Sequence, residues 1–375
     1  MEMEEAALIP GLPHEIAEHC LLHVPFPHQS TVRSVSSAWN RAISHPTFLH
    51  TRKALHLSLP YVFVFAFHRS TLRLQCLALD PRSGRWSILP PMPMPVPSSH
   101  SDPALSPSSF ACAANAVRGE LFFLGGTRSD RNSPMHTLIS YKTSTNSWTV
   151  EEESSMPTAR SYFSAGSIGG KIIVAGGGGV EEDSNSVYNG NADSSSVVEC
   201  YDPVTSQWSQ VAELRSRISK YDSAVVGKKM YITEGWRWPF DTAPRGSVYD
   251  AEMDCWGEMK LGLREGWTGS SVVLGEKLFV ISECGECRVK VYSEEKDTWR
   301  GVIGSGVPVD LRKPFAMAGV VDEEGRRIYV VGAGLNVAVG SMEEVKGEWT
   351  VEWEVVQGPE SFSKLSPAVS KVLYA

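Results

Sequence analysis

The stretch LFFLGG at residues 121–126, followed by Tyr141 and Trp148, decides the fold because the chain repeats it. An apolar strand recurs with a period of roughly 50 residues, which is the spacing of propeller blades. The further strands lie at 171–177, 230–235, 278–283 and 328–334, and the further aromatic pairs are Tyr201/Trp208, Tyr249/Trp256 and Tyr292/Trp299. One four-stranded sheet cannot cover its own faces and must stack on neighbours, so the repeat predicts a β-propeller.

Two counts give the same number of blades. Strands of the YVFVFAF type, beginning at 61–67, number six, and Trp-bearing outer strands also number six if Trp349 or Trp353 ends the last blade. The opening unit, with Leu79 and Trp86, lacks the strand that precedes the apolar strand in every other unit. If residues 365–374 supply it beside 61–67, the ring closes and exposed sheet edges disappear. We expect a mainly β protein with a six-bladed propeller over residues 58–375.

Residues 8–53, which follow an acidic tail at 1–7, have a helical pattern instead. Apolar side chains recur three or four residues apart, as on one face of a helix. Pro13 and Glu15 suit a helix start, and the prolines at 25 and 27 would end the helix. We therefore expect helices at 13–23 and 30–38, followed by Trp39 and Ile43. Such a small unit cannot bury all its apolar groups, so either a partner protein or the propeller covers the rest.

The residue order of this unit resembles the F-box over its whole length. The matching segments are Leu12-Pro13-x-Glu15-Ile16, Leu21-Leu22-x-Val24-Pro25 and Arg33-x-Val35-Ser36-x-x-Trp39-Asn40, with Ser36 where a Cys is often found. An F-box holds the Skp-type adaptor of a cullin ubiquitin ligase, so the resemblance favours a partner protein over the propeller as the cover. The residues that it implies for adaptor binding are Leu12, Pro13, Ile16, Leu21, Val24, Pro25, Val35 and Trp39.

The chain from residue 58 onward resembles kelch repeats. Pairs of glycines end the strands at 125–126 and 176–177, whereas the fourth and fifth units carry Glu234-Gly235 and Ser282-Glu283. An F-box followed by kelch repeats resembles a plant family of substrate receptors, with close stretches such as YVFVFAFHRSTLRLQ at 61–75. This resemblance implies a non-catalytic receptor that brings a protein target to the cullin and RING subunits of a ligase. The quoted stretches are most similar to one member of this family, and that similarity implies a role in far-red light (phytochrome A) signalling.

The target would bind at the blade edge that carries the connections between second and third strands and between blades. Long insertions at 127–137, 178–196 and 236–246 fall there, and arginines at the blade junctions of this edge lie with the aromatic residues of 236–246, a combination that favours interface hot spots. The candidate target-binding residues are Arg160, Arg215, Arg217, Trp236, Trp238, Phe240, Arg264 and Arg312. The alternative is that a kelch arginine at a strand start braces its own blade and that 178–196 is a solvated loop.

Charge and composition exclude several classes of protein. The formal charge is −8 and basic residues are spread out, so affinity for nucleic acid or an anionic membrane is not expected. The N-terminus is acidic where a secretory signal is basic, and the longest apolar run, 61–67, is too short to span a bilayer. We expect an intracellular protein of the nucleus, the cytoplasm or both. Seven widely spaced cysteines do not suggest a disulfide framework.

No set of residues predicts a metal, a cofactor or catalysis. Cys284 and Cys287 have the spacing of a metal-binding pair, but no second pair accompanies them, so a hairpin turn is expected there. Two other function classes stay open from the sequence. One is a kelch-type oxidase or lyase, which would need ligands or acids converging in the central channel. The other is a scaffold or cytoskeletal protein without a ligase, and co-purification with a Skp-type adaptor would separate both from a receptor.

Overall fold

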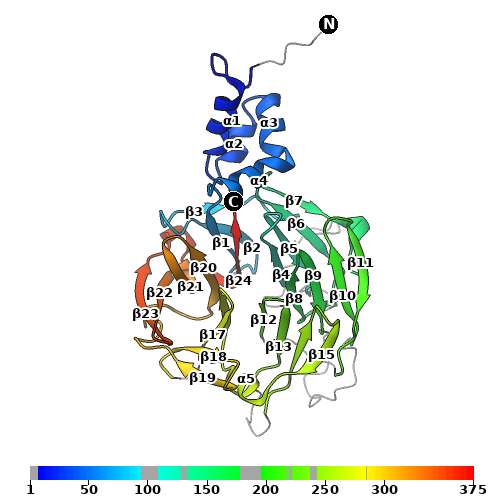
Figure 1. The fold of residues 1–375 in the computed structure, drawn as a ribbon, viewed down its shortest axis with the longest axis vertical. Coiled ribbons are helices and arrows are strands. Elements are labelled where there is room, and N and C mark those ends of the chain that lie inside the picture. The colour runs from blue at the N-terminus through cyan, green and yellow to red at the C-terminus, as the bar shows by residue number, and fades with distance from the viewer. Residues whose placement is uncertain are drawn as a thin grey trace.

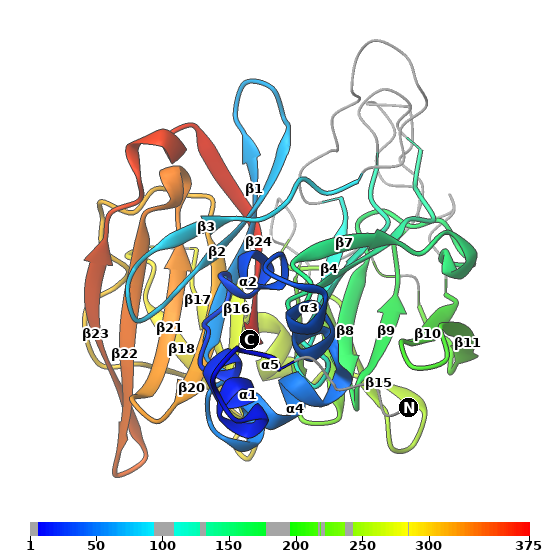
Figure 2. The same ribbon diagram turned by 90° about the horizontal axis from the view of Figure 1, so that it is seen from above.

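A computed structural model of the chain describes residues 7–93, 109–127, 133–177, 196–216, 218, 222–236, 243–283 and 285–375. Six four-stranded sheets form a ring, and a unit of four short helices stands at its rim beside the first blade (Figure 1). Figure 2 shows the same unit from above, over the ends of the first blade. The predicted six-bladed propeller with a leading helical unit is confirmed.

The helical unit contains α1 (His14–Leu22), α2 (Gln29–Arg33), α3 (Ser37–Ser44) and α4 (Pro46–Ala54). The single helix expected at 30–38 is wrong, because the chain leaves the helix after Arg33 and starts again at Ser37. Ser36 is extended, and its hydroxyl accepts a hydrogen bond from the backbone N–H of Trp39 at 3.1 Å. A serine at this N-cap position satisfies a free amide of the next helix, so Trp39 lies inside α3 rather than beyond the motif.

Each blade is an antiparallel sheet whose first strand is innermost. Blade one consists of β24 (Leu365–Tyr374), β1 (Pro60–His68), β2 (Leu74–Leu79) and β3 (Trp86–Ile88). Blade two consists of β4 (Ala111–Asn115), β5 (Glu120–Leu124), β6 (Leu138–Lys142) and β7 (Ser147–Val150). Blade three consists of β8 (Ser164–Ile168), β9 (Lys171–Ala175), β10 (Val198–Asp202) and β11 (Gln207–Val211). Blade four consists of β12 (Asp222–Val226), β13 (Lys229–Thr233), β14 (Gly246–Asp250) and β15 (Cys255–Glu258). Blade five consists of β16 (Ser271–Leu274), β17 (Lys277–Ile281), β18 (Val289–Ser293) and β19 (Thr298–Gly301). Blade six consists of β20 (Ala316–Asp322), β21 (Gly325–Val331), β22 (Val337–Val345) and β23 (Glu348–Val356).

The last strand of the chain closes the ring. β24 pairs with β1 from Pro60↔Tyr374 to His68↔Leu365, with one irregularity between Phe65 and Ala66. It therefore supplies the innermost strand of blade one, which is the pairing that the sequence suggests for residues 365–374. β24 also contacts the innermost strands of the two neighbouring blades, β4 and β20. Main-chain hydrogen bonds within blade one thus join the first and the last strand of the propeller.

The repeated Trp residues attach blades two to six to the blade before each, whereas the indole N–H of Trp86 in blade one is buried without a hydrogen-bond partner. Tyr141 lies directly opposite Trp148 on the next strand, with ring centroids 4.9 Å apart. The indole N–H of Trp148 donates to the Pro90 carbonyl at 2.8 Å, in the connection from the preceding blade. The same bond recurs from Trp208 to Ser154, from Trp256 to Ala212, from Trp299 to Leu263 and from Trp353 to Ser305. Trp353, rather than Trp349, therefore holds this position in the last blade.

Glycine is required where a blade meets the connection to the next blade. At Gly125 (φ 54°) a Cβ atom would lie 2.5 Å from the Arg160 carbonyl oxygen, and at Gly176 (φ 75°) it would lie 2.4 Å from that of Ile218. Any other residue would clash with this backbone and would also be strained at a positive φ. The glycine pairs of the repeat therefore set how closely successive blades approach.

Candidate protein-binding sites

The helical unit has its own small core. Leu8, Ala17, Leu21, Leu22, Ile43 and Phe48 are buried in it. The sequence suggests Leu21 for adaptor binding, but its side chain is buried and stabilises the helical unit instead. Trp39 is half-buried against the same core, and its indole N–H donates to the Leu8 carbonyl. Trp39 is thus covered by its own unit and not by the propeller.

Three other large apolar side chains of this unit stay exposed. Leu12 is 39 % exposed, Ile16 is 52 % exposed and Val35 is 61 % exposed. Leu12 lies just before the N-cap of α1, and Ile16 lies in the first turn of that helix. We call these three residues the adaptor surface. Of the remaining sequence candidates, Pro13 and Pro25 are exposed and Val24 is half-buried.

A buried arginine fastens the helical unit to the propeller. Arg52, at the end of α4, is almost fully buried, and its guanidinium donates to the carbonyls of Leu22 and Val24 in the helical unit. It also donates to the Leu57 carbonyl in the linker at 2.8 Å and to the Ala375 carbonyl after β24 at 3.3 Å. One side chain therefore connects the helical unit, the linker and the strand that closes the ring.

The segment between α1 and α2 enters the propeller core. Phe26 is buried with Tyr61 and Phe63 of β1, with ring centroids 5.0 Å and 5.7 Å away. The Tyr61 hydroxyl donates to the Phe26 carbonyl. Burial raises the pKa of Tyr61 to about 12, so this hydroxyl keeps its proton at neutral pH. Together with Arg52, these contacts form what we call the joint.

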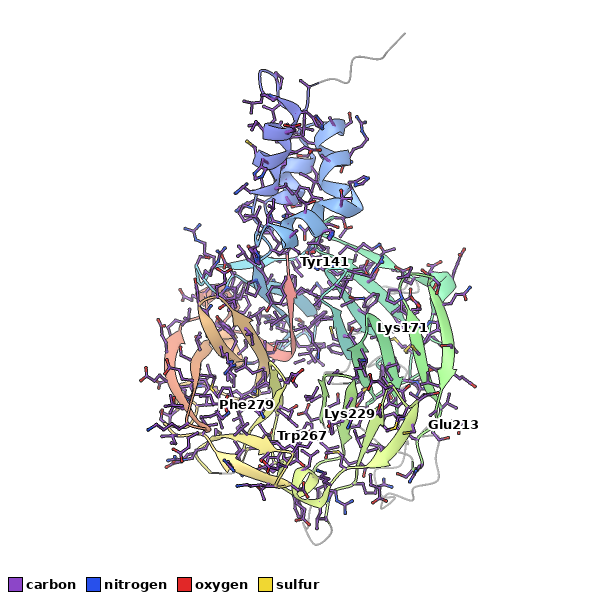
Figure 3. All side chains as sticks on the ribbon, in the orientation of Figure 1. Tyr141, Lys171, Glu213, Lys229, Trp267 and Phe279 are labelled. Carbon is purple, nitrogen blue, oxygen red and sulfur yellow. The ribbon has the colours of Figure 1, made fainter. Side chains whose placement is uncertain are left out.

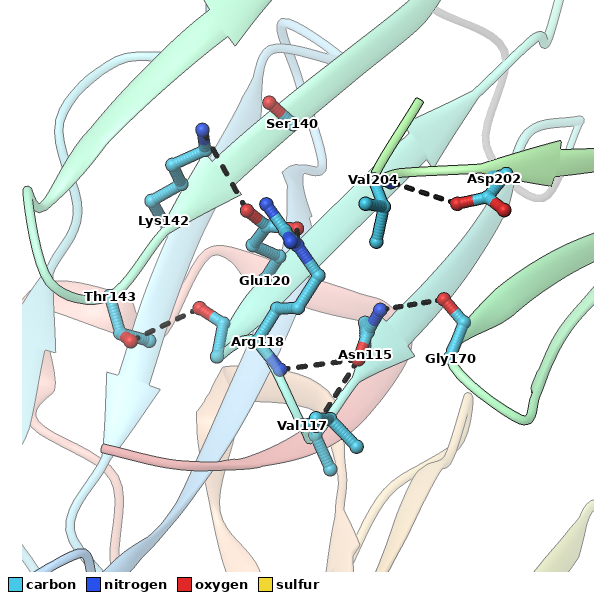
Figure 4. Close-up of polar contacts among 12 residues, drawn as sticks. Asn115, Val117, Arg118, Glu120, Ser140, Lys142, Thr143, Gly170, Asp202 and Val204 are labelled. Atoms are coloured by element: carbon cyan, nitrogen blue, oxygen red, sulfur yellow. Dashed lines mark hydrogen bonds and ion pairs between the residues drawn. The ribbon is translucent and has the colours of Figure 1, made fainter. Parts of the chain in front are cut away.

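Next to the joint, the helical unit contacts a turn of blade two that has several hydrogen bonds of its own. The ammonium of Lys53 donates to the carbonyls of Ala116 and Val117, in the turn between β4 and β5. Burial lowers the pKa of Lys53. In that turn the Asn115 side chain accepts from the Val117 amide at 3.2 Å and donates to the Gly170 carbonyl of the next blade at 2.8 Å (Figure 4).

The charged groups beside this turn are paired with one another. Glu120 forms ion pairs with Arg118 at 2.8 Å and with Lys142 at 3.7 Å (Figure 4). The turn that receives Lys53 is therefore held in place by its own blade and by the neighbouring one. Since both sides of the joint are fixed, the adaptor surface has a defined position relative to the propeller.

Arg160 was expected at a target surface, and the structure shows it inside blade three instead. The side chain is fully buried and donates to the Glu199 carboxylate from Nε at 3.1 Å and from an Nη atom at 2.8 Å. It also donates to the carbonyls of Gly176 and Val197. Arg160 therefore braces its own blade and is not accessible to a target protein.

The other described target candidates lie at the blade edge away from the helical unit. That unit contacts the turns between first and second and between third and fourth strands, so the remaining connections lie on the opposite edge. Arg215 and Arg312 are exposed there. Trp236 donates its indole N–H to the Glu265 carbonyl at 2.8 Å in α5 (Leu261–Gly266), the helix that carries Arg264. Arg217, Trp238 and Phe240 lie outside the described residues.

The central channel opens at this same edge into a cavity that the sequence reasoning missed. The cavity has a volume of about 940 Å³ and is called here the channel mouth. Its aromatic lining comes from Phe67, Phe110, Tyr162 and Phe315, and its basic lining from Arg69, Lys313 and Lys371. None of the described target candidates lines it. A lysine within the mostly small and apolar strand β24 was the one signal that could have indicated this site.

Two searches of the described residues give negative results. No helix in this part of the chain is long and apolar enough to cross a bilayer. No three His, Cys, Asp or Glu side chains among these residues gather as a metal ion would require.

Comparison with known proteins agrees with this two-part architecture. The F-box domain model matches residues 9–51, and the Kelch motif model matches residues 159–215, which contain blade three. The chain is 44 % identical over 369 residues to F-box protein AFR of Arabidopsis thaliana, covering 98 % of this chain and 92 % of that protein. It is 36 % identical to F-box/kelch-repeat protein At1g30090 of the same plant, covering 98 % and 87 %. The chain therefore belongs to the F-box/kelch-repeat proteins.

Proposed function

We propose that this protein is the substrate receptor of an SCF-type ubiquitin ligase. The F-box would bind a Skp-type adaptor, and through it the cullin and RING subunits, while the propeller captures a protein target. The observation that carries the proposal is the exposure of Leu12 and Ile16 on a unit that the joint fixes to the propeller. A cap that served only the propeller would turn these side chains inward.

The residues of the F-box divide into two roles in this proposal. The adaptor surface, with Pro13 and Pro25 beside it, supplies direct apolar contact to the adaptor. Leu21 and Trp39 act from beneath, because they hold α1 and α3 together. Leu21 also lines a cavity of about 410 Å³ between the helices, together with Phe48 and Ala42.

The protein would carry out no bond chemistry of its own. Holding a target beside the charged conjugating enzyme raises the effective concentration of the target's lysines, so that transfer becomes effectively intramolecular. A rigid connection suits this role, because a loose one would spread the target over many positions. The four hydrogen bonds from the two Nη atoms of Arg52 and the burial of Phe26 supply that rigidity.

The target would bind at the edge of the propeller away from the helical unit. Arg215, Arg264, Arg312 and Trp236 stay candidates for this contact, as do Arg217, Trp238 and Phe240. Arginine and tryptophan at such an edge favour a protein partner. Arg160 is excluded from the set because it is buried in the blade.

We further propose a place for the protein in far-red light signalling, in the nucleus, the cytoplasm or both. The support for this step is the sequence resemblance over nearly the whole chain to a member of this family. Expression of this chain in Arabidopsis thaliana seedlings that lack AFR should restore their far-red response, and a variant with Ile16→Asp should not. Equal failure of both proteins would contradict the far-red role and leave the ligase role standing.

The receptor function is tested by what accumulates when adaptor binding is lost. Cells that express the Ile16→Asp variant should accumulate ubiquitination targets, compared with cells that express the unchanged protein, as measured by quantitative proteomics. A point variant is needed because removal of the helical unit would also take Phe26 out of the propeller core. Arg41→Met, an exposed change in α3 at a residue outside the proposed adaptor contacts, serves as the control. Identical proteomes for Ile16→Asp and the unchanged protein would reject the proposal.

A further inference from the structure

The channel mouth exposes two bulky side chains on strained backbone. Tyr162 has φ 51° and is 41 % exposed, and Leu72 has φ 52° and is 38 % exposed. Both line the same cavity, next to the half-buried ring of Phe315. The left-handed region is unfavourable for large residues and tends to persist where a binding site requires it. The mouth therefore presents apolar groups that the fold does not need for its own packing.

The charges at the mouth are mainly basic. Arg69 and Lys371 have no acidic partner within the described part of the chain, and Lys313 donates to the Glu283 carbonyl at 3.2 Å.

Two acids, Asp222 and Glu283, line the same cavity beside the three cations, so the described lining keeps a small net positive charge. The Asp222 carboxylate accepts from the amides of Ser223 and Ser271 and from the indole N–H of Trp267, which is labelled in Figure 3. Only Glu283 remains among the described acids of the lining. The field at the mouth thus favours an anionic ligand.

Lys371 also reaches into the narrow channel behind the mouth. That channel has a volume of about 260 Å³, and Lys371 is the only charged residue among the described residues that line it. A lysine in a narrow space that is otherwise lined by uncharged residues is suited to bind a carboxylate.

We propose that the channel mouth binds an extended segment of the target protein and that a carboxylate of this segment enters the channel to pair with Lys371. The proposal rests on the proposed function, because the ligand is the target protein. Apolar side chains of the segment would pack on Tyr162, Leu72 and Phe315. The channel is smaller than pockets for drug-sized ligands, which begin at about 300 Å³, so it admits a side chain or a chain end and not a folded loop.

The chemistry of the site favours a carboxylate over a phosphate. Phosphorylated segments are recognised in proteins by clusters of arginines that bind several oxygens at once. The channel offers one lysine, which is a single point charge and matches a singly charged carboxylate.

The first experiment uses the full chain and needs no variant. A display library of random linear peptides is selected on the protein, and enriched sequences are synthesised in matched forms for affinity measurement by fluorescence polarisation. One arm replaces the terminal carboxylate by an amide, and the other replaces Asp and Glu by Asn and Gln, which tells the two carboxylate sources apart. Neutralising one carboxylate should weaken binding about tenfold or more, or about 1.4 kcal/mol. Absence of enrichment, equal affinity of the neutral forms, or binding only of phosphorylated forms would overturn the proposal.

A second experiment assigns the effect to the channel. Lys371→Met should weaken binding of the carboxylate peptide by the same factor. The variant should also bind the carboxylate and neutral forms equally well, as a double-mutant cycle requires when two groups interact. Lys371→Arg should retain most of the affinity. Lys171→Met is the matched control, because Lys171 is an exposed lysine paired with Asp202 away from the channel (Figure 3). Unchanged affinity in a folded Lys371→Met protein would contradict the assignment.

The same proteins separate this inference from the ligase function. Adaptor binding is measured on the unchanged chain and on Lys371→Met, and it should be equal in the two. Carboxylate-dependent peptide binding without any adaptor binding would leave the channel site standing and reject the receptor. Adaptor binding, together with peptide binding that does not depend on a carboxylate, would leave the receptor standing and reject the channel site.

Discussion

The joint and the channel mouth handle polar groups in opposite ways. At the joint, Arg52 is almost fully buried and donates to four carbonyls, and the half-buried Lys53 beside it donates to two. At the mouth, Arg69 and Lys371 have no acidic partner within the described chain.

The difference separates groups that hold the molecule together from groups that are available to others. A buried donor that is fully paired makes a rigid connection, and leaving its partners unpaired is costly. An unpaired donor in a cavity contributes nothing to folding and gains free energy only when a ligand arrives. Sequence pattern treats all these residues alike, as basic residues in a repeat protein, whereas their partners decide which role each one has.

The largest expected effect concerns Arg160, the fully paired arginine of blade three. Arg160→Met should lower the free energy of unfolding by about 3–5 kcal/mol, because the Glu199 carboxylate would be left buried without its partner. The measurement is chemical denaturation of the full chain. Arg215→Met, which removes an exposed arginine of the neighbouring connection, should change it by less than about 0.5 kcal/mol. Equal effects of the two changes would contradict the assignment of Arg160 to the blade.

The next effect concerns the joint. Arg52→Met should lower the free energy of unfolding by about 2–3 kcal/mol, because several buried carbonyls would lose their donor. Limited proteolysis should also cut the linker near Leu57 faster than in the unchanged protein. Arg41→Met, in exposed α3, is the control and should leave both measurements unchanged. A fully stable Arg52→Met protein would show that the helical unit is not fastened by this residue.

The smallest expected effect on stability concerns Tyr162 at the channel mouth. Tyr162→Gly should leave the free energy of unfolding unchanged or raise it by up to about 1 kcal/mol, because glycine adopts a positive φ without strain. The same change should weaken binding of the carboxylate peptide, since the exposed ring is removed. Tyr162→Phe keeps the ring and should bind normally. A large loss of stability in Tyr162→Gly would show that the ring serves the fold.

Much of the fold follows from short-range rules that the sequence displays. The Tyr141/Trp148 pattern and the glycines at strand ends predict the blades, since each has a local physical reason. The closing strand 365–374 could be expected because the first unit lacked a strand. The bounds of the F-box helices are harder to predict, because the apolar pattern across 30–38 suggests one continuous helix, whereas Ser36 caps the start of a new one.

The binding sites depend on contacts between distant segments, which sequence patterns predict poorly. Arg160 was grouped with exposed arginines because its partner, Glu199, is 39 residues away. The channel mouth draws residues from several blades, so no local pattern marks it. Leu12 and Ile16 were identified through their resemblance to the F-box, and their exposure is a property of the fold.

Direct binding of a purified Skp-type adaptor tests the central claim, that the adaptor surface is held outside the propeller for another protein. Isothermal titration of the full chain should show a tight complex for the unchanged protein and at least tenfold weaker binding for Ile16→Asp, with the thermal unfolding midpoint of the variant unchanged. Equal affinity of the two proteins, or no binding by either, would contradict the account.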